Sequence, residues 1–346
     1  MGAAESIALA THDPGYSEIN RMESLHPDLP ILLYLLGGSS INQEFYDTLD
    51  TYVLPGGTLS GQSKATPEED VTDTEPQQME YTRPNGDTYY VRDWNGMRDV
   101  AVLQACAEAR QYVYMYGPPG TGKTALAEAA FGENLVTVVC SGDTTTLDLI
   151  GQWIPNPKFG EPGELEHIWA DGPVVVAAEN GWPLLLDEAG LVEPKVLSAI
   201  YGLLDGRREI NVTMNPKRGI VKAKEGFFFI AASNPKAPGV NMSEALLSRM
   251  TVHVEVTTDW ALALSKLNVP EQVVGIAQSL SKKLDAGEID WAPQMRELLA
   301  FRDIKAVFGE KFAVQNLIAT APAESREDVQ EAMRRFFGAV ALPSRI

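Results

Sequence analysis

Short runs of apolar residues recur along the chain between about residues 81 and 258, and segments with a helical spacing of apolar positions separate them. Five of these runs have the length and composition of buried strands: 112–116, 135–140, 183–186, 227–232 and 252–256. Between the third and fourth runs, one face of a predicted helix carries Val196, Leu197, Ile200, Leu203 and Leu204. Strands that alternate with helices predict a parallel sheet that is covered on both faces.

The strand-like runs stop after about residue 259, and the last 88 residues follow a helical pattern. Near the end of the chain, Ser325 and Asp328 have the spacing of a capping box, and an apolar stripe that reaches Val340 follows them. We therefore predict an α/β domain over residues 81–258 and a small helical domain over residues 259–346.

The first eighty residues have a different composition from the rest of the chain. Residues 1–54 contain short apolar patches spaced as two short helices could be, whereas residues 55–80 are rich in Gly, Ser, Thr, Pro, Gln and acids. The latter composition offers too little apolar surface to offset the entropy lost on ordering. We expect an acidic N-terminal segment over residues 1–54 and a disordered linker over residues 55–80.

Charge and cysteine content exclude several classes of protein. The formal net charge is 28 − 47 = −19, and residues 1–80 hold fourteen acidic and two basic residues, so the other 266 residues carry only −7. A uniformly basic nucleic-acid-binding surface is excluded, although a local basic element is not. Two cysteines and four scattered histidines form no CxxC or HxxxH pair, so we expect neither a disulfide framework nor a zinc site. The apolar run 29–36 is too short to cross a bilayer, and we expect a cytoplasmic protein without a membrane segment.

One segment matches the complete phosphate-binding pattern GxxxxGK[ST]. It directly follows the run 112–116 and opens a helix-like segment, which is the context that the pattern requires. Its glycines let main-chain N–H groups converge on phosphate oxygens, and the N-terminus of the helix adds partial positive charge. Lys123 would bridge the β- and γ-phosphates, and the Thr124 hydroxyl would ligate Mg²⁺. The residues of this predicted loop are Gly117, Pro118, Pro119, Gly120, Thr121, Gly122, Lys123 and Thr124.

Two further strand-like runs end in polar residues suited to act on a bound nucleotide. Asp187 and Glu188 follow the run 183–186; Asp187 would hold Mg²⁺ through water, and Glu188 can accept a proton from an attacking water. Two adjacent carboxylates favour hydrolysis over phosphoryl transfer to another substrate. Asn234 follows the run 227–232 and can orient that water, because open α/β sheets bind ligands at the carboxyl edge of their strands.

The segments GPPGTGKT, LLLDEAG, FIAASNP and ALLSRM stand in an order and spacing that resemble those of the AAA+ ATPases, and more narrowly their MoxR-like, dynein-related branch. The resemblance covers roughly residues 81–340. It implies a P-loop AAA+ core, in which a parallel five-stranded sheet lies between helices and carries two β-hairpin inserts, followed by a small all-α lid domain. It also implies a Walker A motif at residues 117–124, a Walker B motif at Asp187 and Glu188, a sensor 1 residue at Asn234, and ATP as the nucleotide.

The same resemblance implies arginines that act on the nucleotide. Arg249 would be the arginine finger that reaches the nucleotide of a neighbouring subunit, and Arg296 resembles sensor 2 of the lid. Arg207 and Arg208 could also lie at a subunit interface, so the identity of the residue that acts in trans stays open. A guanidinium supplied in trans raises the rate by roughly 10³ to 10⁵. Hydrolysis would then require assembly, and the family implies a homo-hexameric ring.

Two inserted segments, residues 144–181 and 205–226, resemble hairpins that face the central pore in rings of this branch. From residue 217 on, the second carries four basic residues, Lys217, Arg218, Lys222 and Lys224, against Glu225 alone. In a ring, these groups could grip an acidic polypeptide or a nucleic-acid backbone, or they could belong to a solvated hairpin without a partner.

We therefore expect Mg²⁺-dependent ATP hydrolysis by a ring-forming ATPase that remodels or matures a protein partner. Relatives in this branch often act with a protein that bears a von Willebrand factor A domain. Two alternatives remain: a nucleic-acid motor or restriction-type NTPase subunit, motivated by the basic hairpin, and a binding module in which nucleotide acts only as a conformational latch. Stimulation of turnover by a protein, stimulation by DNA or RNA, and absence of turnover after assembly separate the three.

Overall fold

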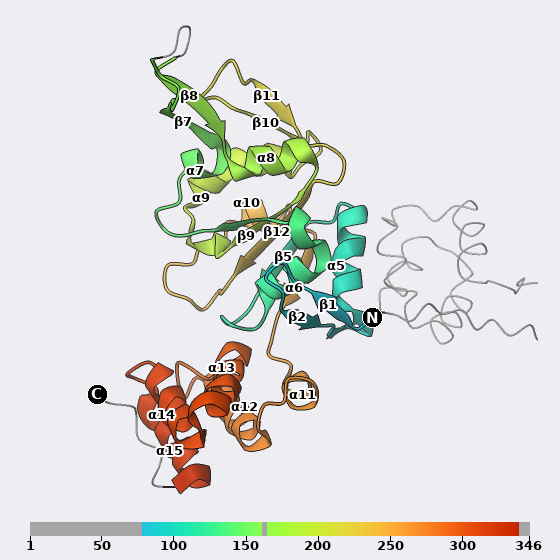
Figure 1. The fold of residues 1–346 in the computed structure, drawn as a ribbon. Coiled ribbons are helices and arrows are strands. Elements are labelled where there is room, and N and C mark those ends of the chain that lie inside the picture. Colours follow the sequence, from blue (N-terminus) through green and yellow to red (C-terminus); the bar gives the residue numbers. More distant parts are fainter. Residues whose placement is uncertain (1–77, 161–164, 339–346) are drawn as a thin grey trace, which may run out of the picture. The chain divides into compact units, whose positions relative to one another are not determined.

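Five parallel strands form the central sheet (Figure 1). The computed structural model describes residues 78–160 and 165–338, so the predictions for residues 1–54, for nearly all of the linker and for Val340 lie outside it. The strands are β5 Val113–Tyr116, β6 Val136–Val139, β9 Pro183–Asp187, β12 Phe228–Ser233 and β13 Val252–Glu255. Their order in the sheet is β13-β5-β12-β9-β6. Each falls on a predicted run, and the prediction of a parallel sheet is confirmed.

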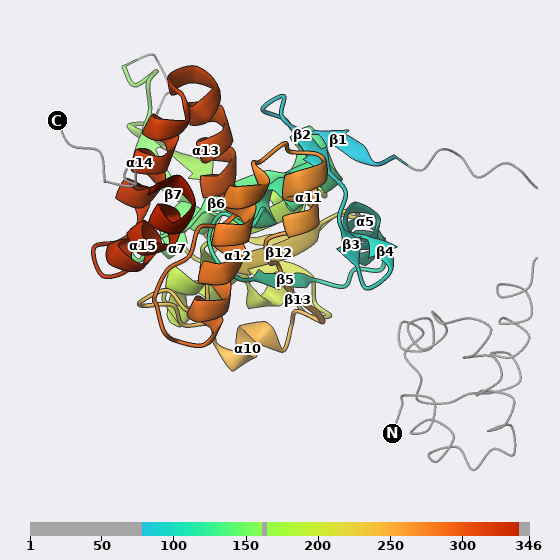
Figure 2. The same ribbon diagram turned by 90° about the horizontal axis from the view of Figure 1, so that it is seen from below.

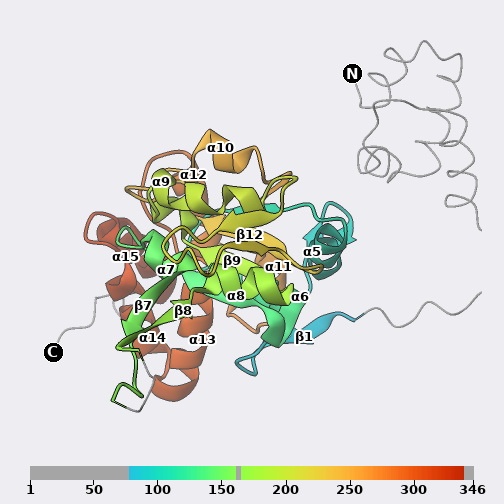
Figure 3. The same ribbon diagram turned by 90° about the horizontal axis from the view of Figure 1, so that it is seen from above.

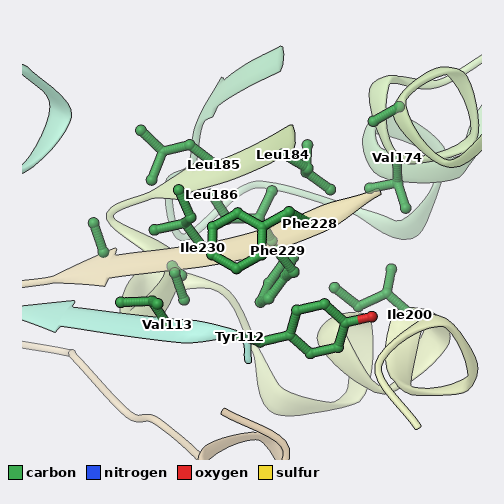
Figure 4. Packing of buried hydrophobic residues seen from close by; sticks show 14 of the residues in the cluster. Tyr112, Val113, Val174, Leu184, Leu185, Leu186, Ile200, Phe228, Phe229 and Ile230 are labelled. Atoms are coloured by element: carbon green, nitrogen blue, oxygen red, sulfur yellow. The ribbon is translucent and has the colours of Figure 1, made fainter. Parts of the chain in front are cut away.

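The central strands are buried on both faces. All six residues of β12 are buried, as are the first four residues of β9. Consecutive buried residues require cover on both sides of a sheet. The ring of Tyr112 packs 6.3 Å from the rings of both Phe228 and Phe229, measured between ring centres (Figure 4). This packing holds β12 beside β5, so the segments that follow these two strands begin close together.

Helices precede and connect the strands of the sheet. They are α5 Asp99–Glu108, α6 Lys123–Phe131, α7 Thr146–Ile150, α8 Pro173–Asn180, α9 Pro194–Leu197 and α10 Glu244–Leu247, with 3₁₀ turns at Gly132–Asn134, Ala189–Leu191 and Ser198–Leu203. Figure 3 shows α8 beside β9. The helix predicted around Ile200 is only partly α-helical, because α9 continues as the 3₁₀ turn. Leu197, Ile200 and Leu203 are spaced by three residues, which aligns them on one ridge at three residues per turn.

Four two-stranded hairpins accompany the sheet in the described part of the chain. They are β1 Glu80–Thr82 with β2 Thr88–Tyr90, β3 Asp93–Trp94 with β4 Met97–Arg98, β7 Gly151–Pro155 with β8 His167–Asp171, and β10 Glu209–Asn211 with β11 Ile220–Lys222. The last two are the predicted inserts, and they lie side by side (Figure 1): the Trp153 indole N–H donates to the Met214 carbonyl oxygen at 3.3 Å. The first two hairpins were not predicted; Figure 2 shows α5 next to the β3–β4 hairpin.

The C-terminal part of the described chain is helical, as predicted. Its helices are α11 Trp260–Ser265, α12 Glu271–Asp285, α13 Met295–Phe308, α14 Glu310–Thr320 and α15 Arg326–Phe337. They have a hydrophobic core of their own, which includes Ile276, Phe301 and Val314. None of the helices in the described part of the chain is long and apolar enough to span a membrane.

The predicted capping box at the start of α15 is wrong. Ser325 has helical backbone angles, φ −98° and ψ −3°, and its side chain makes no capping hydrogen bond. A capping residue normally has an extended backbone that directs its side chain at the N–H groups of the first turn. Asp328 instead pairs with Lys283 of α12 at 3.2 Å, so its charge joins two helices of the domain.

Candidate nucleotide-binding site

The loop predicted to bind phosphates joins the end of β5 to the start of α6. Gly117, Gly120 and Gly122 have φ values of +141°, +77° and +94°. A Cβ atom on Gly117 would lie 2.4 Å from the carbonyl oxygen of Val256, and one on Gly120 would lie 2.9 Å from Cβ of Arg296. Other residues rarely adopt these angles, so the path of the loop requires glycine at these positions.

Lys123 is the first residue of α6 and is 6% exposed. Its Nζ donates to the carbonyl oxygens of Gly117 and Pro118, each at 2.9 Å. Burial lowers the pKa of Lys123, while the carboxylates of Glu188 and Asp187 act to raise it. An ammonium group has three donors, so two bonds to the loop leave one N–H for an anionic ligand.

Thr124 and Asp187 bring the loop and β9 together. The Thr124 hydroxyl donates to Oδ2 of Asp187 at 2.7 Å. Glu188 follows in the left-handed region, with φ 56° and ψ 34°, and its N–H donates to Oδ1 of Asp187 at 3.1 Å. A non-glycine residue in this region costs on the order of 1–3 kcal/mol and is often found at functional sites. The sharp turn places two carboxylates at the edge of the sheet beside the loop.

Cys140 lies next to these carboxylates but carries no reactive thiolate. Its N–H donates to the Asp187 carbonyl oxygen at 2.8 Å. Burial, and then the negative charges of Asp187 and Glu188, raise the pKa of the Cys140 thiol to about 12. The thiol therefore stays protonated near neutral pH and adds no charge to this edge of the sheet.

Several of the predicted residues meet in a cavity of about 320 Å³. Its lining includes Lys123, Thr124, Asp187, Glu188 and Arg296. Arg296 belongs to the first turn of α13, where its own N–H donates to the Gly120 carbonyl oxygen at 3.2 Å. The helical domain adds four apolar side chains to the lining: Leu262, Leu267, Met295 and Leu299. A cavity that combines charged groups with aliphatic groups suits a ligand with an anionic part and an apolar part.

Asn234 directly follows β12, the strand that lies between β5 and β9. It therefore stands between the loop and the two acids at the same edge of the sheet. Its Oδ1 accepts a hydrogen bond from the N–H of Lys236 at 3.2 Å, and Asn234 is not among the described residues that line the cavity.

Arg249 also lies outside the lining of this cavity. It follows α10 and is half-buried, with its guanidinium carbon 4.6 Å from the centre of the Tyr201 ring. Arg207 pairs with Asp205, with Nη2 2.8 Å from Oδ2. Arg208 donates from Nη2 to the Lys224 carbonyl oxygen at 3.0 Å. The structure thus places Arg296 with the loop and the other three arginines elsewhere.

Sequence reasoning missed the residues that the β1–β2 hairpin and the segment after it contribute to the cavity. They include Arg83, Tyr89 and Arg92. The neighbouring turn at Asn95 and Gly96 has φ values of 53° and 85°, and an Asn-Gly pair between short strands is a recognisable hairpin pattern. The turn could have been predicted; the contact of Arg92 with the loop could not.

The strand, glycine-rich loop and helix with Lys123, together with paired carboxylates on a neighbouring strand, define a P-loop nucleoside triphosphatase. A family model for the AAA domain (dynein-related subfamily) matches residues 112–250. An uncharacterized protein of Staphylococcus haemolyticus is 31% identical over 230 residues, which cover 62% of this chain and 86% of that protein. One of Staphylococcus aureus is 31% identical over 240 residues, which cover 65% of this chain and 89% of that protein. The chain belongs to the AAA+ ATPases, in their dynein-related, MoxR-like branch; it binds nucleotide and hydrolyses ATP.

Solved structures with some similarity include a candidate ATPase from Cytophaga hutchinsonii, with a TM-score of 0.38 and 15% identity, covering 68% of this chain and 79% of that one. NtrX from Brucella abortus, in complex with ADP, has a TM-score of 0.39 and 18% identity, covering 69% of this chain and 59% of that one.

Proposed function

We propose that the chain hydrolyses ATP with Mg²⁺ as one subunit of a ring that remodels a protein partner. The contact between Thr124 and Asp187 supports this most directly, because it brings the phosphate-binding loop within hydrogen-bond distance of the carboxylate that would complete a metal site. In this proposal, the loop Gly117–Thr124 holds the phosphates through its main-chain N–H groups. Lys123 adds the one N–H that the loop carbonyls leave unused.

The residues at this edge fit Mg²⁺. A hydroxyl and a carboxylate are oxygen ligands of the kind that Mg²⁺ prefers, and it is usually bound by one or two carboxylates together with substrate phosphates. No cluster of three or more His, Cys, Asp or Glu that could hold a metal occurs in residues 78–160 and 165–338. The cation would therefore come with the nucleotide, held by Thr124 and Asp187, and would supply charge neutralisation at the phosphates.

Glu188 is the residue that we assign as general base. It lies beside Asp187 in the lining of the cavity, and its left-handed backbone turns it out of the line of the strand. A carboxylate there can accept a proton from the attacking water. Asn234, at the end of the neighbouring strand, would orient that water, and Arg296 would hold the phosphates from the helical domain of the same chain.

Arg249 is the residue that we assign to the neighbouring subunit's nucleotide. Its guanidinium rests on the Tyr201 ring, outside the cavity of its own chain, which holds the charge in a fixed place. Arg207 fits this role less well, because the carboxylate of Asp205 already neutralises its charge. Fixed charge that arrives from a second subunit makes hydrolysis depend on assembly.

The paired hairpins favour a protein as the partner. Ile168, Met214 and Ile220 are 37%, 38% and 58% exposed and offer apolar contact to a polypeptide, while Trp153 and Phe159 of the first hairpin are 48% and 62% exposed and offer rings on which bases could stack as well. The basic character of the second hairpin is also reduced, because Arg218 pairs with both Asp171 and Glu179. A nucleic-acid motor remains the second candidate, motivated by Lys217, Lys222 and Lys224 of residues 205–226.

Mixing two inactive variants tests the ring. Arg249→Ala keeps its own loop and acids, whereas Glu188→Gln keeps the arginine that would serve a neighbour. Each variant alone should bind ATP without turnover, and a mixture should regain turnover wherever an intact Glu188 faces an intact Arg249. A mixture as inactive as its components would refute the assignment of Arg249 in trans.

The class of partner is tested with defined probes. Turnover of the assembled wild-type protein is measured alone, with single-stranded DNA, and with an unfolded polypeptide. Stimulation by the polypeptide supports the proposal, whereas stimulation by DNA alone supports the motor.

A further inference from the structure

Arg92 lies outside the residues matched by the family model, yet it contacts the phosphate-binding loop. Its side chain is 13% exposed and stands between the β1–β2 and β3–β4 hairpins. From Nη1 it donates to the Thr121 carbonyl oxygen at 2.9 Å. From Nε it donates to the Tyr89 hydroxyl at 2.9 Å and to Oδ2 of Asp99 at 3.2 Å. One guanidinium thus joins a buried polar cluster to the loop.

The buried cluster fixes the position of this guanidinium. Asp99 is 3% exposed and accepts hydrogen bonds from the Tyr89 hydroxyl and, at 3.1 Å, from the N–H of Arg92 itself. Burial raises the pKa of Tyr89, so its hydroxyl stays protonated and donates. Burial acts to lower the pKa of Arg92, but Tyr89 and Asp99 raise the pKa by more than burial lowers it, so the side chain stays charged. The backbone N–H and the Nε of Arg92 are therefore both fixed by hydrogen bonds, so the position of Nη1 is also fixed.

We propose that Arg92 is a positioning residue, which orients the peptide bond between Thr121 and Gly122 for phosphate binding. No peptide bond among the described residues is cis, and in a trans peptide the carbonyl oxygen and the following N–H point in opposite directions. With the Thr121 carbonyl held by Arg92, the N–H of Gly122 points away from Arg92 and is available to a phosphate oxygen. This inference rests on the proposed function, since it takes residues 117–124 as the phosphate site.

The conformational freedom of Gly122 explains why the peptide bond between Thr121 and Gly122 needs a restraint. It has φ +94° and no Cβ atom, so its own backbone does little to prevent rotation of the preceding peptide. The guanidinium lies directly against it: a Cβ on Gly122 would lie 3.8 Å from Nη1 of Arg92. The hydrogen bond from Arg92 supplies the restraint that the glycine lacks.

The hydrogen bond from Arg92 to Thr121 is not needed to anchor the β1–β2 hairpin. The β1–β2 hairpin is already tied to α6 by Arg83, whose Nε donates to Oε2 of Glu128 at 2.7 Å. The bond from Arg92 to Thr121 is therefore a separate connection, which ends on the loop and not on the helix.

The test compares Arg92→Lys with Arg98→Lys. Lysine keeps the positive charge beside Asp99, but one amine cannot serve both the cluster and the Thr121 carbonyl as the planar fork does. Arg98 is the matched control, because among the described residues its Nη1 donates to the exposed Gln78 carbonyl oxygen, at 3.3 Å, away from the loop. Affinities for ADP and AMP are measured by competition with a fluorescent nucleotide, together with thermal unfolding. The ratio of the ADP to the AMP affinity should fall about tenfold in Arg92→Lys, as for the loss of one hydrogen bond to a charged group, and stay unchanged in Arg98→Lys.

Each outcome of this comparison either supports or overturns the positioning role of Arg92. An unchanged ratio in Arg92→Lys, or a parallel fall of both affinities, overturns the inference, because a merely structural role would not separate ADP from AMP. If Arg92→Lys fails to fold, Tyr89→Phe keeps the packing of the ring while removing one hydroxyl that fixes Nε. Its ratio should fall about threefold, and an unchanged ratio overturns the inference.

The same measurement separates this inference from the proposed site. Wild-type protein should prefer ADP to AMP, and Lys123→Ala should lose that preference. A wild-type protein without the preference refutes the phosphate site itself, whereas a preference that survives in Arg92→Lys refutes only the role of Arg92.

Discussion

Gly117→Ala should destabilise the start of the phosphate-binding loop by more than the addition of one methyl group suggests. The new Cβ would lie 2.4 Å from the Val256 carbonyl oxygen, whereas Cβ atoms rarely come within 3.0 Å of another heavy atom. The obstacle cannot move aside easily, because the N–H of Val256 donates to the Tyr116 carbonyl oxygen at 2.7 Å. On the other side, the N–H of Gly117 donates to the Ser233 carbonyl oxygen at 3.2 Å. The loop thus starts between two strands that both hold it.

Two costs add at this position. Placing alanine at φ +141° costs about 1–3 kcal/mol, and forcing a methyl group into a packed position costs a further 1–3 kcal/mol or so. We therefore expect Gly117→Ala to lower the free energy of unfolding by about 2–6 kcal/mol and to weaken ADP binding. Gly275→Ala is the control, since Gly275 lies in α12 with nothing within 4 Å of a new Cβ; it should stabilise by about 0.5–1 kcal/mol.

Urea denaturation measures the free energy of unfolding of both variants, and titration with ADP measures binding. If Gly117→Ala stays within about 0.5 kcal/mol of the wild type and binds ADP as well, the close approach of β13 to the loop does not restrict this position.

Two further predictions concern the lysine and the sheet. Because burial lowers the pKa of Lys123 in the free protein and a bound phosphate favours its charged form, ADP binding should take up protons, and this uptake should grow as pH rises toward the pKa of the free lysine. Calorimetry in two buffers of different ionisation enthalpy measures the uptake, and proton release that grows over this range would contradict it. Leu185 is fully buried in β9, so Leu185→Ala should lower the free energy of unfolding by about 2–5 kcal/mol, whereas Val139→Ala, 76% exposed on the edge strand β6, should change it by less than about 0.5 kcal/mol. Similar effects of the two variants in urea denaturation would contradict the burial of the sheet.

The sheet was predictable because its strands are continuous apolar runs. Runs such as Phe228–Ser233 are buried on both faces, so they carry a strong pattern, and their order along the chain with intervening helices leaves few topologies. The loop at residues 117–124 and the acids at 187 and 188 were predictable for a similar reason, since each follows such a strand. Parallel pairing then brings their ends together, as the bond between Thr124 and Asp187 shows.

The parts that were missed depend on contacts between residues far apart in the chain. Arg92 is one charged residue in a polar segment, and only the fold reveals that it reaches Thr121. Asp328 has the spacing of a cap, but an ion pair with Lys283 of another helix competes for its carboxylate. The indole N–H of Trp153 donates to Met214 in a separate insert, which no local pattern indicates.

The ability of Glu188→Gln to bind ATP without hydrolysing it tests the central claim most directly. ATP affinity and steady-state turnover are measured for this variant, for the wild type, and for Glu193→Gln, an exposed acid nearby that pairs with Lys195. The account predicts that Glu188→Gln binds ATP like the wild type and loses turnover by about 10² to 10⁴, while Glu193→Gln keeps both. Turnover of Glu188→Gln at the wild-type rate would show that the acids beside the loop do not perform the hydrolysis.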